Sequence, residues 1–195
     1  PSKYIKIEFQ GGEPLLNKEV VFETVQYAKD KNKDLGKDLE FVICTNLIEI
    51  DTKIIDFLKE NQEVQISTSL DGPKYLNDSA RVFPNGSGTY AGFIQKLNML
   101  RSQIASDRIS ALTTITSYNV EKMKEIIDEY INLKFDSVFL RPLNPFGYAE
   151  KKWQELAYPV EKFIKYYTEA LDYLIEINKK GTFIREEFAT IFLYK

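Results

Sequence analysis

Glycines and polar side chains follow the strand-like runs of this chain, where a ligand could meet them. The first run ends in Gln10-Gly11-Gly12-Glu13-Pro14. Two adjacent glycines let the backbone turn sharply and approach a ligand, and the Glu13 carboxylate could accept hydrogen bonds from an ammonium group. The same residues also fit an ordinary strand-to-helix turn, in which Glu13 favours the helix dipole and Pro14 starts the helix.

The third run ends in Ser69-Leu70-Asp71-Gly72-Pro73 and leads into a long connection over residues 71–88. Ser69 and Asp71 point to one side of an extended chain, so a hydroxyl and a carboxylate could meet one polar ligand. Arg81, inside the connection, could place its planar fork on a ligand carboxylate. The alternatives are an ordinary turn at residues 71–73 and a solvated arginine.

Two other runs end in less specific patterns. The fifth leads into Arg141-Pro142-Leu143-Asn144-Pro145-Phe146-Gly147, an irregular edge whose backbone groups could contact a flat heterocycle or simply form a rigid turn. The second ends in Cys44-Thr45-Asn46. There, Cys44 fits a small core residue, and Thr45 or Asn46 would cap the helix expected near Asp51 or close the turn before it.

Composition excludes several classes of chemistry. The 195 residues include no histidine and one cysteine, so Ser-His-Asp and Cys-His systems, histidine metal sites and internal disulfides are excluded. The formal net charge of -3, with interspersed signs, argues against nucleic acid as the main partner. No apolar run reaches the ~18 residues of a membrane span. A lone cysteine in a chain rich in Lys and Glu indicates a reducing, cytoplasmic location.

Strand-like and helical segments alternate along the chain, which predicts an α/β fold. Parallel strands with helical crossovers form an open sheet or part of a barrel. Helices of similar length favour the barrel, and five strands are too few to close it, so we expect an open, partial TIM-type βα barrel of about five parallel strands. A short strand and a helix would follow Gly181. The expected strands are 4–9, 40–44, 64–70, 109–115 and 137–140, and the expected helices are 17–31, 51–60, 89–104, 120–133 and 160–178.

Taken in order, these motifs resemble the radical S-adenosylmethionine superfamily over about residues 4–149. Within it, the chain is similar to peptide maturases with a C-terminal auxiliary-cluster (SPASM-like) domain. Anaerobic sulfatase-maturating enzymes and the radical maturase of the His-Xaa-Ser system are examples of that type.

The resemblance implies a role for each motif in binding S-adenosylmethionine. The Gly-Gly-Glu segment would receive the methionine ammonium, and Gln10 and Ser69 would lie by the methionine or ribose. Arg81 would pair with the methionine carboxylate, and the backbone of Leu143 would hold the adenine. The expected cofactor site comprises Gln10, Gly11, Gly12, Glu13, Ser69, Asp71, Arg81 and Leu143.

The chain also departs from the family pattern. The Cys-x3-Cys-x2-Cys loop that binds the four-iron four-sulfur cluster is absent, so we expect no metal ligand and no catalytic residue in this segment. Leu47 stands where relatives often have glycine. We expect a segment of a longer protein, with residues 1–149 forming the core minus its first strand and cluster loop. Residues 150–195 would form a helical extension toward a missing auxiliary domain.

By this resemblance, the intact protein would generate a 5'-deoxyadenosyl radical to modify a peptide or protein side chain. Its reductant would be a flavodoxin or ferredoxin, and the segment alone would be inactive. One alternative is a non-catalytic peptide-binding module on a degenerate barrel. Another is an unrelated βα barrel such as an aldolase, but that reading predicts a late phosphate-binding glycine loop or a buried catalytic lysine, and neither is evident.

Overall fold

The structure is a computed structural model that describes residues 2–193, with the side chain of Tyr148 left out. Its main sheet has five strands in the order β1-β2-β3-β4-β6, which confirms the predicted number of strands. The predicted core segment begins at Pro1 and the predicted helical extension ends at Lys195, and both of these residues lie outside the described part of the chain. The strands are β1 (Tyr4–Phe9), β2 (Asp38–Thr45), β3 (Val64–Ser69), β4 (Ile109–Ile115) and β6 (Leu140–Pro142).

The chain divides into two compact units. The first contains the residues up to 69 and residues 91–110, and the second contains residues 70–90 and those from 111 onward. The helical segment from residue 150 thus belongs to the same unit as residues 111–149. The domain boundary predicted at residue 149 stays a prediction.

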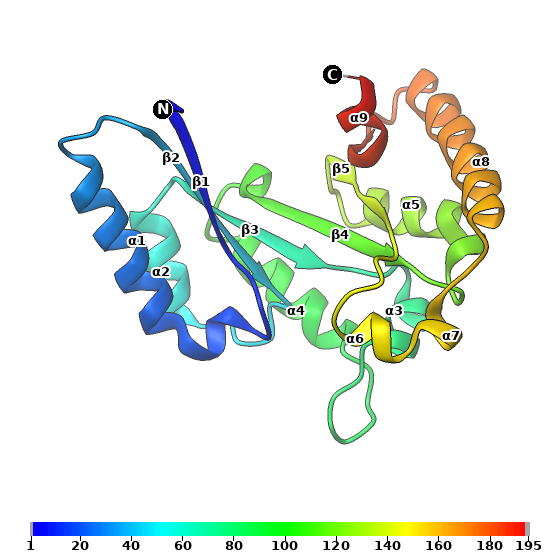
Figure 1. Ribbon diagram of the computed structural model, residues 1–195, viewed down its shortest axis with the longest axis horizontal. Coiled ribbons are helices and arrows are strands. Elements are labelled where there is room, and N and C mark those ends of the chain that lie inside the picture. Colours follow the sequence, from blue (N-terminus) through cyan, green and yellow to red (C-terminus); the bar gives the residue numbers. More distant parts are fainter. Residues whose placement is uncertain (1, 194–195) are drawn as a thin grey trace. The chain divides into compact units, whose positions relative to one another are not determined.

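In the first unit, β2 lies between β1 and β3, and both pairings are parallel. The alternation along β2 turns Phe41 and Ile43 into the core, where neither is exposed. Two helices, α1 (Lys18–Asn32) and α2 (Thr52–Glu60), lie side by side (Figure 1). The rings of Phe22 and Phe57 join these helices, with centroids 4.0 Å apart. Because the strands are parallel, the turns after β1 and β2 leave the same edge of this sheet.

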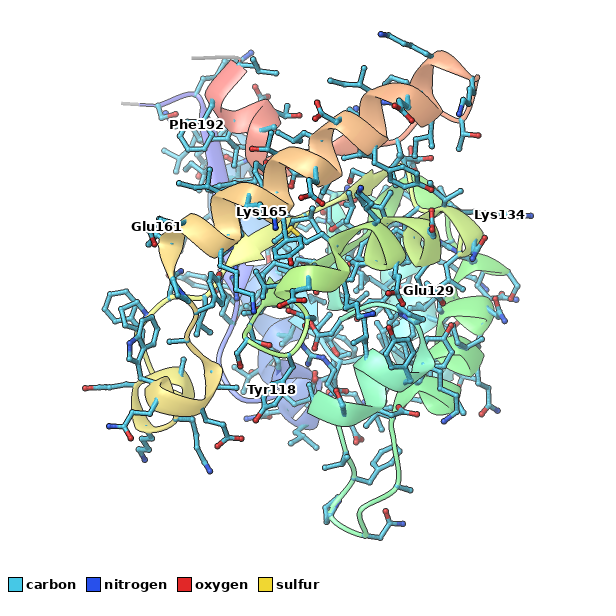
Figure 2. All side chains as sticks on the ribbon, turned by 90° about the vertical axis from the view of Figure 1, so that its right-hand side faces the viewer. Tyr118, Glu129, Lys134, Glu161, Lys165 and Phe192 are labelled. Atoms are coloured by element: carbon cyan, nitrogen blue, oxygen red, sulfur yellow. The ribbon has the colours of Figure 1, made fainter. Side chains whose placement is uncertain are left out.

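In the second unit, α5 (Met123–Asn132) and α8 (Val160–Lys179) pack against each other. Figure 2 shows Glu129 and Lys134 on the α5 side, and Glu161 and Lys165 on α8. One stripe of α5 carries Ile126, Ile127 and Tyr130, which are all fully buried. The stripe fixes the face that α5 turns to the core.

The fifth predicted strand, 137–140, is wrong as one element. Its first half, β5 (Ser137–Val138), pairs in parallel with β7 (Arg185–Glu186), whereas β6 pairs with β4. The change of partner is fixed by the buried carboxylate of Glu186, which accepts a hydrogen bond from the backbone N–H of Leu140 at 3.1 Å. A side chain from a distant segment takes this donor, so local sequence did not indicate the break.

The remaining helices include several that the sequence did not predict. The connection over residues 71–88 contains α3, which Pro73 precedes as its N-cap residue. The short strand and the helix expected after Gly181 are confirmed by β7 and α9. None of the helices in the described part of the chain has the length and apolar character needed to cross a membrane. These further elements are α3 (Lys74–Ala80), α4 (Tyr90–Arg101), α6 (Tyr148–Lys151), α7 (Trp153–Leu156), α9 (Glu187–Leu193), and the 3-10 helices η1 (Pro14–Asn17), η2 (Ser106–Arg108) and η3 (Val120–Lys122).

Leu47 occupies a backbone conformation that favours glycine. Its φ is +68°, yet its side chain is completely buried in the first unit. The left-handed conformation costs a leucine about 1 kcal/mol or more, while burying its side chain contributes about 1.5–3 kcal/mol. Packing therefore outweighs the strain, and the turn keeps its glycine-like geometry without glycine.

We expect Leu47→Ala to lower the free energy of unfolding by about 3 kcal/mol, because buried methyl and methylene groups are lost while the strain remains. Leu47→Gly should be about 1 kcal/mol more stable than Leu47→Ala, since glycine adopts this φ freely. Urea unfolding monitored by circular dichroism measures both.

The matched control is Leu58, which is fully buried in α2. There glycine should be about 1 kcal/mol less stable than alanine, the ordinary order inside a helix. If glycine were also the less stable variant at Leu47, the strain assigned to this turn would be wrong.

Candidate functional site

The first group of candidate residues is organised around the Glu13 carboxylate. Its Oε1 accepts hydrogen bonds from the Leu15 N–H at 3.1 Å and the Thr45 hydroxyl at 2.7 Å. Its Oε2 accepts one from the Asn46 N–H at 2.8 Å. An ionised carboxylate has about four acceptor positions, so most of them bind this chain's own donors. Glu13 thus joins the turn after β1 to the turn after β2 and can accept little more.

The two glycines before Glu13 differ in what requires them. Gly11 has φ of +127°, a conformation that side chains rarely adopt. Gly12 has an ordinary φ, and a Cβ built there would meet no atom within 4 Å. Nothing in the described chain therefore explains glycine at position 12, whereas close approach of a ligand to this backbone would. Beside them, the Gln10 amide donates to the Glu8 carboxylate on the exposed end of β1.

Thr45 and Asn46 close the turn after β2, one of the two roles that the sequence left open. The Thr45 hydroxyl accepts from the Leu47 N–H at 3.1 Å, and Asn46 Oδ1 accepts from the Ile48 N–H at 2.9 Å. Helix α2 is capped instead by Asp51 (Oδ1, 2.9 Å from the Ile54 nitrogen).

Hydrogen bonds hold the Asp51 cap in its ionised form. The Lys18 ammonium and then the Ile54 N–H lower the pKa of Asp51 below its usual value. The cap is therefore charged at neutral pH, the state that a helix N-terminus favours.

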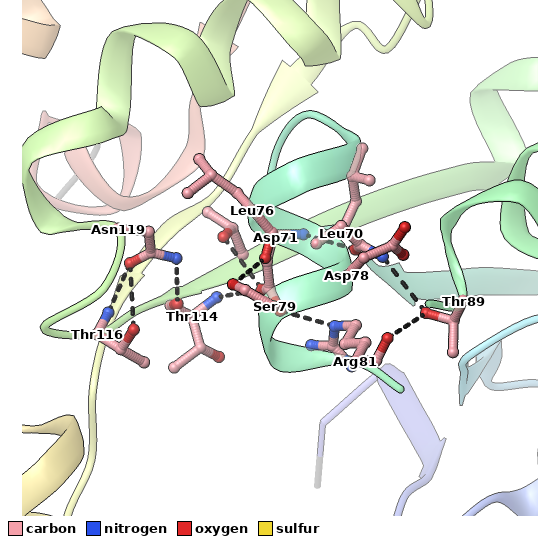
Figure 3. Close-up of polar contacts among 12 residues, drawn as sticks. Leu70, Asp71, Leu76, Asp78, Ser79, Arg81, Thr89, Thr114, Thr116 and Asn119 are labelled. Atoms are coloured by element: carbon pink, nitrogen blue, oxygen red, sulfur yellow. Dashed lines mark hydrogen bonds and ion pairs between the residues drawn. The ribbon is translucent and has the colours of Figure 1, made fainter. Parts of the chain in front are cut away.

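The second group is built on Asp71, whose side chain is buried (Figure 3). Its Oδ2 accepts from Arg81 Nε at 2.7 Å, and its Oδ1 accepts from the Thr113 hydroxyl at 3.2 Å and the Thr114 N–H at 3.3 Å. Its backbone N–H donates to Asn77 Oδ1 at 3.3 Å. Asp71 therefore joins helix α3, Arg81 and β4 within the second unit, and its carboxylate fixes the direction of the arginine.

Arg81 lies at the base of a β-hairpin that projects from the second unit in Figure 1. Both the N–H and the hydroxyl of Thr89 donate to the Arg81 carbonyl, at 3.1 and 3.2 Å. The outer nitrogens of the guanidinium make no hydrogen bond with the residues that the structure describes. Arg81 is thus held at its backbone and its Nε, while its fork stays available for a carboxylate.

Asp78 explains the glycine at the other end of the hairpin. A Cβ on Gly88 would lie 2.0 Å from the Asp78 carboxyl carbon. Asp78 in turn accepts from the Tyr90 N–H at 2.8 Å, next to the start of α4, and from Lys74 at 2.6 Å. Burial alone would raise the pKa of Asp78, but these hydrogen bonds outweigh it and lower that pKa. The charged carboxylate thus anchors the hairpin to α3.

Leu143 follows β6, and the N–H group of its backbone is already hydrogen-bonded within the chain. Its N–H donates to the Tyr158 hydroxyl at 3.0 Å. Burial raises the pKa of Tyr158 above its usual value, and the bond from Leu143 opposes this weakly. The phenol stays protonated at neutral pH, so it holds the turn after β6 through a neutral hydrogen bond.

One cavity of about 690 Å³ in the second unit brings part of the predicted site together. Asp71, Arg81 and Leu143 all line it. Gln10, Gly11, Gly12, Glu13 and Ser69 belong to the first unit. The sequence missed the hydrogen bond from Thr45 to Glu13 and the contributions of Thr114 and Tyr158, because ordinary strand and loop residues carry no local signal of a distant partner.

The described residues hold no group of three or more histidine, cysteine, aspartate or glutamate side chains arranged to bind a metal ion. An iron-sulfur cluster needs several thiolates, and the chain has only Cys44. The described residues therefore do not fit such a cluster. The glycine turn of the first unit offers backbone acceptors, and the Arg81 fork of the second unit offers donors that suit a carboxylate.

Comparison with known protein families shows which family this chain belongs to. The family model described as the Radical SAM superfamily matches residues 2–157. The chain belongs to this superfamily. The expectation drawn from the order of the motifs is thus confirmed, and the chain carries a radical SAM core.

Two relatives and one solved structure illustrate the likeness. An uncharacterized protein of Methanocaldococcus jannaschii is 29% identical over 83% of this chain and 53% of its own length. The radical SAM cyclopropyl synthase TigE of Paramaledivibacter caminithermalis is 30% identical over 88% of this chain and 34% of its own length. A structure of native anSMEcpe with bound AdoMet and Kp18Cys peptide matches with a TM-score of 0.82 and 21% identity.

The structural match covers 96% of this chain and 51% of the anSMEcpe chain. It confirms the predicted fold class, an α/β partial barrel of five parallel strands. This chain spans about half the length of that enzyme and of the first relative.

The Asp71 network yields a stability prediction. We expect Asp71→Asn to lower the free energy of unfolding by about 2 kcal/mol, between the losses typical of exposed and buried pairs, because Asp71 is buried while the side chain of Arg81 is 32% exposed. The amide oxygen can still accept from the Thr114 N–H, so the loss reports mainly on the arginine. Chemical denaturation measures it.

The control is Lys122→Gln, which removes the exposed pair between Lys122 and Glu125. It should cost less than about 0.5 kcal/mol. Equal losses in the two variants would show that Asp71 does not support the site in the way described.

Proposed function

We propose that this chain binds and orients S-adenosylmethionine in a radical SAM enzyme that modifies a peptide or protein side chain. The observation that carries the proposal is the Gly12 backbone, which needs no glycine for its own fold and so favours a close ligand. Family membership and the AdoMet named in the anSMEcpe structures support the choice of cofactor.

The turn after β1 would receive the methionine ammonium. Three chain donors already occupy the Glu13 carboxylate, so the glycine carbonyls are the main acceptors that we assign to the ammonium. Glu13 would act chiefly as a positioning residue that fixes this turn through Thr45 and Asn46. Gln10 and Ser69 would lie by the methionine or ribose.

The opposite charge of the methionine would meet Arg81. Nε of Arg81 donates to the Asp71 carboxylate. The two outer nitrogens of Arg81 form the fork that suits a carboxylate. Asp71 would therefore serve the cofactor through Arg81. At the adenine end, Tyr158 accepts the Leu143 N–H, so we assign the Leu143 carbonyl oxygen to the adenine amino group.

In the intact enzyme, one electron from a four-iron four-sulfur cluster would split the bound cofactor into methionine and a 5'-deoxyadenosyl radical that removes a hydrogen atom from the substrate. The cluster ligands would lie outside this chain. The peptide named in the anSMEcpe title supports a peptide substrate. A SPASM-like domain and a role akin to sulfatase maturation are part of the proposed maturase type. A flavodoxin or ferredoxin reductant, a cytoplasmic location and an inactive isolated segment belong to the same proposal.

The glycine turn provides a direct test of cofactor binding. Gly12→Ala should leave the free energy of unfolding within about 1 kcal/mol of the native value, because its methyl group meets open space at an ordinary φ. It should weaken S-adenosylmethionine binding about tenfold or more, a steric loss of at least ~1.4 kcal/mol. Equilibrium dialysis with radiolabelled cofactor on the cluster-loaded parent protein measures this.

Gly11→Ala is the contrasting variant, since its positive φ predicts a loss of about 1–3 kcal/mol in stability. If Gly12→Ala binds the cofactor as tightly as the native protein, the assignment of this turn fails.

The reaction is tested on the parent reading frame. We expect three cysteines at Cys-x3-Cys-x2-Cys spacing upstream of Tyr4, and reductant-dependent release of 5'-deoxyadenosine and methionine from the reconstituted protein. If the frame lacks those cysteines and no 5'-deoxyadenosine forms, the chain is instead a peptide-binding module on a degenerate barrel.

A further inference from the structure

A second arginine, Arg141, lines the same cavity as Arg81 and Leu143. It lies on β6, where it is in register with Thr114 of β4. Side chains alternate along a strand, and its neighbour Leu140 is completely buried in the core. Arg141 therefore projects from the opposite face of the strand, on the same side as Thr114, and its side chain reaches the cavity.

Among the described residues that line this cavity, Arg141 is the cation that pairs with no carboxylate. Of the acidic side chains in the lining, Asp71 pairs with Arg81 at 2.7 Å. The other acid, Glu155, pairs with Lys152 at 3.1 Å and accepts from the Tyr118 hydroxyl at 2.7 Å.

Arg141 forms no ion pair with any residue that the structure describes. Its hydrogen bond is a long one, 3.4 Å to the Thr114 hydroxyl. The lining thus keeps one positive charge, and it sits on a side chain that is weakly held.

We propose that Arg141 binds a carboxylate of the peptide substrate, from an acidic side chain or from the peptide's C-terminus. This inference rests on the proposed function, which commits Arg81 to the cofactor. A guanidinium binds a carboxylate through two parallel hydrogen bonds, and the hydroxyl of Thr114, which also lines the cavity, can donate beside it. Arg141 would select a substrate that carries an anion near the residue to be modified.

Exposed aromatic rings in the same lining favour a peptide over a small anion. Phe146 is 77% exposed and Tyr118 is 56% exposed. Figure 2 shows Tyr118 in the turn that follows β4. Solvent-exposed rings beside a cation offer apolar contacts for substrate side chains while the arginine fixes one charged group. The cavity thus combines the two kinds of contact that a short acidic peptide needs.

The experiment uses the cluster-loaded parent protein with S-adenosylmethionine and three octapeptide libraries. All are acetylated and randomised except at a central residue, which is Asp in the first library and Asn in the other two. The first two are C-terminally amidated, and the third has a free carboxylate. Immobilised protein should retain the Asp library, the free-carboxylate library or both about fivefold better than the amidated Asn library, the scale of an exposed charged hydrogen bond.

Arg141→Gln should reduce this preference to about one, and Arg141→Lys should restore only part of it, because lysine lacks the planar fork. Both variants should bind S-adenosylmethionine within about twofold of the native protein. The matched control is Lys151→Gln, which removes an exposed charge from α6 that does not line the cavity. It should keep the native preference.

The inference is overturned if the native protein binds the cofactor but shows no preference for a carboxylate, or if the preference survives in Arg141→Gln. A loss of cofactor binding in Arg141→Gln would also overturn it, by placing this arginine at the cofactor. Failure of the native protein to bind S-adenosylmethionine would refute the proposed function instead. The two failures are thus distinguishable.

Discussion

The second unit depends on one buried carboxylate, that of Asp71. Burying a charge is costly unless other groups compensate it, and here a guanidinium, a hydroxyl and a backbone N–H do so together. These donors come from the hairpin base and from β4, so the strand, helix α3 and the arginine must all be in place for the charge to be tolerated. A requirement of stability therefore also sets the direction of the Arg81 fork.

The first unit uses the same device with weaker burial. Glu13 collects donors from its own turn and from the turn after β2, and Leu47 keeps that second turn in a glycine-like conformation by filling the core. In both units, an acidic residue that the sequence suggests as a ligand serves mainly to position other groups. Under the proposed function, the groups left for the cofactor are the glycine backbone and the Arg81 fork.

Strand and helix periodicity predicted most of the fold, and the order of the motifs predicted the family, because both signals are local. What the sequence did not predict has a common physical origin. The break at Phe139 depends on Glu186, and the hydrogen bond that Thr45 adds to its turn role depends on Glu13. Arg141 becomes a candidate for substrate binding only because the other charged side chains of its cavity are paired with one another. Such side-chain partnerships join distant segments, and no local pattern indicates them.

The hairpin between Arg81 and Thr89 has a further consequence. Its base is clamped to α3 and to the start of α4 by Thr89 and Asp78, whereas its tip, Asn85-Gly86-Ser87, is exposed. Length and sequence at the tip can therefore change without moving the arginine below it, because loop closure costs little for each added residue. The tip can therefore vary in length and sequence among homologous proteins. It is also a suitable attachment point for a fluorescent or affinity label.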